Sequence, residues 1–76
     1  MQARMRIFHP GQAVTHFAFG YVANIGIAVV QAVRTLGYSF PGVKAMTTVS
    51  DNYETEFAFY TDSECQDMIG VLFVRR

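Results

Sequence analysis

Residues 53–60 have the sequence YETEFAFY, in which Phe57 and Phe59 alternate with Glu56 and Ala58. Alternation with a period of two is typical of a β-strand that has one buried and one exposed face. Burial of each phenylalanine contributes about 2–3 kcal/mol, and a small domain cannot build a core from an alanine and a glutamate instead. The two phenylalanines are therefore predicted to face the core, and the alternate residues to face outward.

A similar pentapeptide occurs earlier, since HFAFG at 16–20 matches EFAFY at 56–60. The match predicts two strands in equivalent environments, over 14–19 and 54–60. The Phe-Ala-Phe pattern in two strands resembles the signatures of RNA-recognition motifs, whose aromatic side chains stack on RNA bases. That resemblance implies RNA binding on the sheet, but the basic residue and glycine that begin the signature are replaced here by Thr55 and Glu56.

Turn and helix signals divide the rest of the chain. Turns are predicted at 9–12, at 41–42 and in a hairpin at 50–53. Residues 4–8 are predicted to be an extended edge strand, and 43–49 a further strand. Apolar residues recur at helical spacing between 22 and 36, so a helix is predicted to end at Gly37. Its inward face is predicted to hold Val22, Ile25, Val29, Val33 and Leu36, and its apolar back Ala23, Ile27, Ala28 and Ala32.

The C-terminal segment allows two interpretations. Thr61-Asp62-Ser63 is a typical helix start, so a short helix over 63–69 followed by a strand at 71–74 is predicted, with Cys65 in the core. The alternative is one continuous helix. The first interpretation gives one α+β domain over 1–76, an antiparallel sheet with helices on one face, in the ferredoxin-like order βαββαβ. The strands at 14–19 and 54–60 would then be neighbours in its middle.

Composition excludes several classes of protein. Of 76 residues, 51% are hydrophobic and 16% charged, with a formal net charge of zero, which excludes intrinsic disorder and gives no overall basic field for DNA or an anionic membrane. A single cysteine cannot form an internal disulfide. The nearly apolar run 17–33 is interrupted by Asn24 and Gln31, so no membrane span is predicted. We expect a soluble cytoplasmic protein.

The outward face of the predicted sheet carries the candidate ligand site, formed by His16, Glu54, Glu56 and Tyr60. If His16 and Glu56 are neighbours, the carboxylate can position the imidazole as a general base. The alternative is an ordinary polar cross-strand pair. No metal-ligand spacing, phosphate-binding loop or catalytic motif accompanies them, so no metal, cofactor or catalytic residue is predicted, and an enzyme is the less favoured class.

The same face also carries small and apolar residues that predict an interface: Val14, Ala18, Ala45, Thr47, Val49 and Ala58. Two such sheets could pack face to face, or two chains could meet through the apolar back of the helix. The leading hypothesis is a small interaction protein that forms a homodimer or higher oligomer, or that binds another protein. A small-ligand binder or minimal enzyme, with its site at the dimer interface around His16 and Glu56, is the alternative. RNA binding is a distant third.

Overall fold

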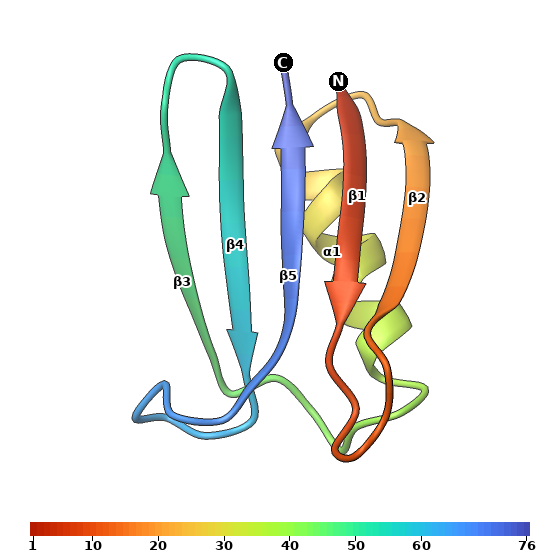
Figure 1. Ribbon diagram of the computed structural model, residues 1–76. Coiled ribbons are helices and arrows are strands. Elements are labelled where there is room, and N and C mark those ends of the chain that lie inside the picture. The colour runs from red at the N-terminus through yellow and green to blue at the C-terminus, as the bar shows by residue number, and fades with distance from the viewer.

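A computed structural model describes residues 1–76 and contains five strands and one helix (Figure 1). The elements are β1 (Gln2–Ile7), β2 (Thr15–Tyr21), α1 (Ile25–Leu36), β3 (Ala45–Ser50), β4 (Glu54–Tyr60) and β5 (Met68–Arg75). All five strands form one antiparallel sheet in the order β2-β1-β5-β4-β3. The chain is thus a small α+β domain, as predicted.

The order of elements is ββαβββ, which differs from the predicted βαββαβ. The segment predicted at an edge is β1, and it lies between β2 and β5. The predicted central pairing of β2 with β4 is therefore wrong, since two strands separate them. The physical reason is that Ala3, Met5 and Ile7 are all buried on one face of β1. In a strand with neighbours on both sides, the core-facing side chains are flanked by those of both neighbours, whereas an edge strand leaves one side open to water.

Helix α1 begins after Asn24, whose Oδ1 accepts a hydrogen bond of 2.9 Å from the backbone N–H of Ile27. This contact satisfies one of the free N–H groups at a helix start. The helix ends at Gly37, as predicted, where the Gly37 N–H donates to the carbonyls of Val33 and Arg34. With only 12 residues, it is not long and apolar enough to cross a membrane.

The buried face of α1 is rotated from the predicted one. Val22 and Leu36 are buried and Ile25 and Val29 pack against the core, as predicted. Ala28 and Ala32, assigned to the back of the helix, are 0% exposed, whereas Val33 is 38% exposed. The small side chains allow the helix to approach the sheet closely. Gly70 of β5 lies beneath the helix. A Cβ atom added to Gly70 would be only 3.1 Å from Leu36 Cδ2, so a larger residue would crowd the helix. Ala28 and Ala32 are therefore covered by the chain's own core, whereas Ile27 of the predicted back is exposed.

Residues 61–67 form a loop where a short helix was predicted, and β5 follows directly. The Asp62 carboxylate accepts hydrogen bonds from the backbone N–H groups of Gln66 and Asp67, and Cys65 has a φ of 57°. Side chains of this kind offer the backbone an alternative to helical bonds. The helix over 63–69, the continuous helix and the core position of Cys65 are all wrong. The predicted strand at 71–74 is confirmed as part of β5.

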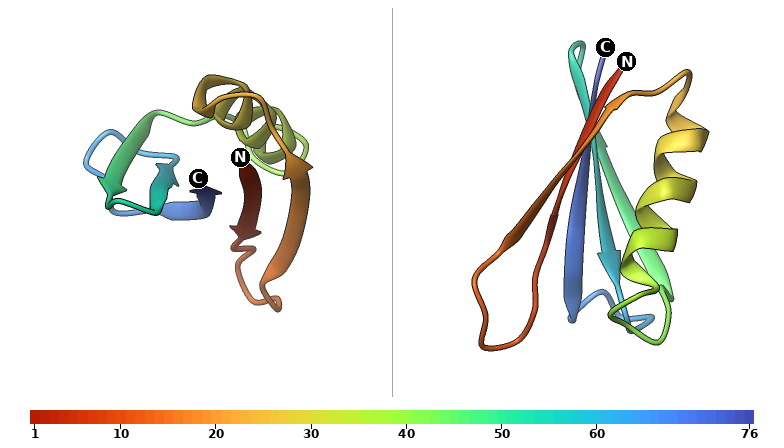
Figure 2. Two further views of the ribbon diagram at one scale, coloured as in Figure 1. Left: turned by 90° about the horizontal axis from the view of Figure 1, so that it is seen from above. Right: turned by 90° about the vertical axis from the view of Figure 1, so that its right-hand side faces the viewer.

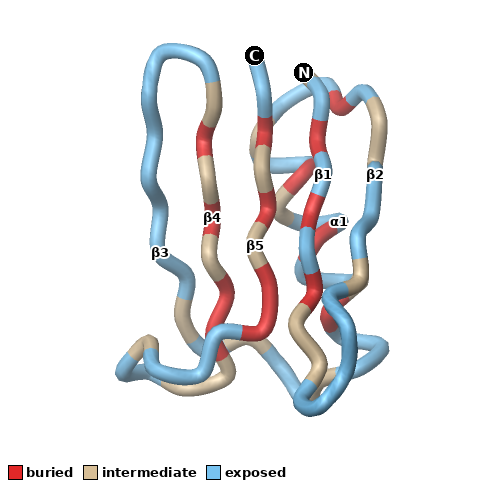
Figure 3. The backbone as a smooth tube through the Cα atoms, viewed as in Figure 1, coloured by how far each residue is buried: buried red, intermediate tan, exposed pale blue.

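The core lies between the sheet and α1, which covers only one face (Figure 2). Phe57 and Phe59 are 6% and 0% exposed, so their predicted inward orientation is confirmed. Phe17 is 41% exposed because β2 is an edge strand, and the environments of the two pentapeptides are not equivalent. Along β1, β4 and β5 buried residues alternate with more exposed ones (Figure 3). The exposed alternate set forms the uncovered face of the sheet.

Candidate interaction surface

We call the sheet face opposite α1 the open face. Strand alternation and pairing assign to it His16, Ala18, Gln2, Arg4, Arg6, Val71, Phe73, Arg75, Glu54, Glu56, Ala58, Ala45, Thr47 and Val49. No other element of the chain packs over this face (Figure 2). Its residues therefore remain available to a partner.

Cross-strand pairing arranges the middle of the open face in two rows that run across all five strands. The Phe73 row consists, from β2 to β3, of Ala18, Arg4, Phe73, Glu56 and Val49. The Val71 row consists of His16, Arg6, Val71, Ala58 and Thr47. In both rows the central strand contributes an apolar side chain, so Val71 and Phe73 form an apolar centre line along β5, which ends at Arg75.

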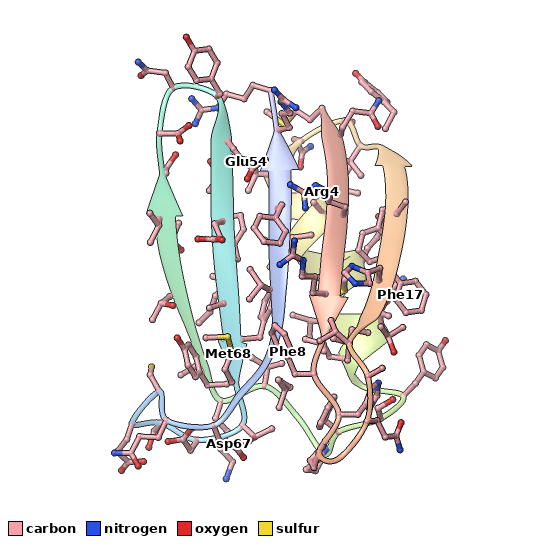
Figure 4. The ribbon with its side chains drawn as sticks, in the orientation of Figure 1. Arg4, Phe8, Phe17, Glu54, Asp67 and Met68 are labelled. Atoms are coloured by element: carbon pink, nitrogen blue, oxygen red, sulfur yellow. The ribbon has the colours of Figure 1, made fainter.

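The Phe73 ring contacts two guanidinium groups. The Arg4 Cζ atom is 4.4 Å from the centre of the Phe73 ring, and the Arg6 Cζ atom is 5.5 Å from it. Each contact is a cation–π interaction of about 0.5–1 kcal/mol at an exposed site. Arg4 Nη2 also lies 3.6 Å from Glu54 Oε2, across β5 (Figure 4). These contacts hold the Arg4 and Arg6 side chains against the Phe73 ring.

Apart from Arg75 at the end of β5, the charged residues of the open face are divided between its two halves. Arg4 and Arg6 lie on β1, and Glu54 and Glu56 lie on β4, with β5 between them. Arg4 and Glu54 form the only ion pair in the chain, which leaves Arg6 and Glu56 without an oppositely charged partner within 4.0 Å. Glu56 is half-buried as a residue.

The predicted ligand-site residues are not brought together. His16 lies on β2 directly opposite Arg6, and β1 and β5 separate it from Glu56, so the predicted His16–Glu56 pair is absent. Glu54, Glu56 and Tyr60 share β4, but Tyr60 is 8% exposed and its Oη lies 3.3 Å from Thr47 Oγ1. The error follows from the wrong strand order, because the pair was inferred from the adjacency of β2 and β4.

The predicted interface residues lie mostly on one face of the sheet. Five of them share the open face: Ala18, Ala45, Thr47, Val49 and Ala58. Val14 precedes β2 and is 40% exposed. Sequence reasoning missed the middle of the surface, which β1 and β5 supply through Arg4, Arg6 and Phe73. The signal for β1 was present in the alternation of basic and apolar residues from Arg4 to Ile7.

Two carboxyl groups with perturbed pKa values lie in loops, away from the open face. Hydrogen bonds from the backbone N–H groups of Tyr53 and Glu54 lower the pKa of Asp51. The N–H groups of Asp67 and Gln66 likewise lower the pKa of Asp62. Both carboxylates organise a tight turn, and neither belongs to the surface described above.

No protein-family model matches the sequence, and no curated protein or solved structure matches it closely enough to indicate a relationship. We therefore infer function from the geometry of the chain itself.

Proposed function

We propose that this protein is a self-associating interaction module, in which two copies pack with their open faces together. One observation carries the proposal, namely the division of charge about the apolar centre line. Arg4 and Arg6 lie on one side of β5, and Glu54 and Glu56 on the other. A surface of this kind is complementary to a rotated copy of itself, as the interface of a two-fold dimer must be.

The charge pattern selects one of two symmetric arrangements. A two-fold axis parallel to β5 lays β1 of each copy over β4 of the other, so that Arg4 meets Glu56 and Phe73 meets its own copy. Arg75, exposed at the end of β5, is the only charged residue that meets its own copy, and Glu54 is its cross-strand neighbour. An axis perpendicular to the strands would lay β1 over β1 and bring arginine against arginine. Like charges in contact cost several kcal/mol at an interface. The dimer therefore has its axis parallel to β5, with the strands of the two sheets nearly aligned and about 10 Å apart.

This arrangement accounts for the composition of the open face. Phe73, Val71, Ala58 and Val49 form a contact layer of small and medium apolar side chains, and Glu56 gains the cationic partner that it lacks within its own chain. Apolar faces packed together at the centre with charges around them are typical of homodimer interfaces. We also propose a cytoplasmic setting, in which the single thiol of Cys65 stays reduced.

The other two classes have less support. A ligand site around His16 requires a neighbouring carboxylate, and the residue opposite His16 is Arg6. RNA binding requires exposed aromatic side chains, but Phe57 and Phe59 are buried under the sheet, and two glutamates share the open face with Phe73. A carboxylate beside the path of a phosphate backbone opposes binding.

A matched pair of variants on β3 tests self-association. Val49 and Thr48 are adjacent and exposed, but Val49 points to the open face and Thr48 to the other. Sedimentation velocity should give a dimer of the wild type and of Thr48→Lys at concentrations on the order of 10 µM, and a monomer of Val49→Lys, because the lysine buries a charge in the interface. A monomeric wild type, or equal effects of the two lysines, would rule the interface out.

Charge reversal tests the direction of the axis. Arg4→Glu with Arg6→Glu places acid against acid in the proposed dimer, and Glu54→Lys with Glu56→Lys places base against base. Each double variant should therefore be monomeric alone, while an equimolar mixture should form a heterodimer. If instead each double variant dimerises as well as the wild type, β1 does not lie over β4, although self-association itself would stand.

A further inference from the structure

Three loops, 8–14, 37–44 and 61–67, meet at one end of the sheet (Figure 1). They enclose a cleft of about 400 Å³. This volume lies within the range of roughly 300–1,000 Å³ that is usual for small-molecule sites. Its walls are mostly apolar and consist of Phe8, Pro10, Phe40, Pro41, Met68 and Ile69. Phe8, Met68 and Asp67 are visible at this end of the sheet in Figure 4.

One wall of the cleft is a stacked pair of rings. The His9 and Phe40 rings are 5.5 Å apart between centroids and inclined by 15°. Phe40 is held by a 2.9 Å hydrogen bond from its backbone N–H to the Leu36 carbonyl, and the neighbouring Phe8 N–H donates to the Ile69 carbonyl at 2.9 Å. Because these walls are fixed before binding, the protein loses less conformational entropy when a ligand binds.

A carboxylate is held at the rim of the cleft. Thr61 Oγ1 donates a hydrogen bond of 2.7 Å to Asp67 Oδ2, and the Thr61 N–H donates to the Asp67 carbonyl at 3.1 Å. The Asp67 N–H is bound in turn by Asp62 Oδ1 at 2.8 Å. These bonds fix the backbone and one oxygen of Asp67 but leave Oδ1 with no donor from the protein. No lysine or arginine lines the cleft, so Asp67 is its only fully charged residue.

We propose that this cleft binds a small organic ammonium ion with an aromatic or branched apolar body. The body would lie against the His9–Phe40 pair, and the ammonium group would donate a charge-assisted hydrogen bond to Asp67. The aromatic rings add attraction, because their faces carry partial negative charge. Carboxylates and phosphates of the same shape would be rejected by Asp67. The site lies within a single chain, so it stands independently of the proposed dimer.

Three probes that share a phenyl ring and a two-carbon chain test this inference: phenethylamine, phenylethanol and phenylacetate. Titrations of the full chain, followed through its amide and histidine-ring NMR signals, should show saturable shifts at His9, Phe40 and Met68 with phenethylamine. For a ligand of this size we expect a Kd of about a few millimolar. Phenylethanol should bind about tenfold more weakly, because it lacks the charge, and phenylacetate more weakly still.

Two charge-removing substitutions in the same loop distinguish a specific contact from a general field. Asp67→Asn keeps the backbone bonds and an acceptor for Thr61, and it should make the affinities for phenethylamine and phenylethanol nearly equal. Glu64→Gln removes the same charge outside the cleft. It should change the affinity for phenethylamine by less than about twofold, since exposed charges are screened by solvent. Equal binding of the three probes, no saturable shift, shifts confined to the open face, or equal effects of the two substitutions would each overturn the proposal.

Discussion

Phe17 and Phe57 occupy corresponding places in the two similar pentapeptides, yet they are 41% and 6% exposed. Replacement of Phe57 by alanine removes a nearly complete burial and leaves a cavity, and such changes cost about 3–5 kcal/mol. Phe17 buries about three-fifths of its surface at an open edge that water can fill. Its replacement should therefore cost about 1.5 kcal/mol, the transfer contribution of the buried part alone. The difference, about 1.5–3.5 kcal/mol, results directly from the position of β2 at the edge.

Urea unfolding followed by far-ultraviolet circular dichroism gives both free energies. A chain of this length has a total stability of about 4–11 kcal/mol, so Phe57→Ala could remove most of it. Phe57→Leu and Phe17→Leu, which keep most of the volume, provide a milder pair with the same expected order. Each protein should be measured at two concentrations, because dimerisation adds a concentration-dependent contribution. Equal losses at the two positions would refute the edge position of β2 and favour the adjacency of β2 and β4.

Three further predictions concern the other elements. Gly70→Ala should lower the free energy of unfolding by about 1–3 kcal/mol, because the new Cβ meets Leu36 Cδ2 and the Arg6 carbonyl oxygen, both at 3.1 Å; Ala58→Ser, on the open face of β4, is the control and should change it by less than about 0.5 kcal/mol. Asn24→Ala should cost about 1 kcal/mol through loss of the helix cap, whereas Asn52→Ala, an exposed hairpin residue, should be nearly neutral in the same urea titration. Since the pKa of Asp51 is lowered in the folded chain, its carboxylate stabilises the fold at neutral pH, and that contribution is lost as the pH falls through and below about 4. Asp51→Asn should therefore lose less stability than the wild type between about pH 5 and pH 3, and parallel losses would show that Asp51 makes no such contribution.

Features that depend on neighbouring residues could be predicted from the sequence. Alternation fixed the inward orientation of Phe57 and Phe59, and turn residues located the hairpin between β3 and β4. Five of the six predicted interface residues share the open face for the same reason, because the phase of a strand is a local property. The rotation of α1 was less accessible, since apolar residues surround the helix and the pattern alone does not separate its two faces.

Features that depend on distant residues could not be predicted in this way. The pairing of β1 with β5 joins segments at opposite ends of the sequence, and no pattern within either one specifies it. The tight packing at Gly70 comes from Leu36 and Arg6, which are remote in sequence. The proposed His16–Glu56 pair failed with the strand order. The arginines over Phe73 were missed because their role appears only once β1 is placed beside β5.

That pairing of β1 with β5 also constrains how the chain can fold. About 60 residues separate Ile7 from Met68, and the two strands meet in register from Gln2–Arg75 to Ile7–Gly70. Because these contacts join residues that are far apart in sequence, a long loop must close before they form. The entropy cost of that closure comes before any stabilisation from the contacts, and folding is slowed. During synthesis, the β1–β2 hairpin and the β3–β4 hairpin emerge first, each with an unpaired inner edge. Only β5 joins them, so a ribosome-bound chain that lacks it carries two exposed edges on which non-native strands can pair.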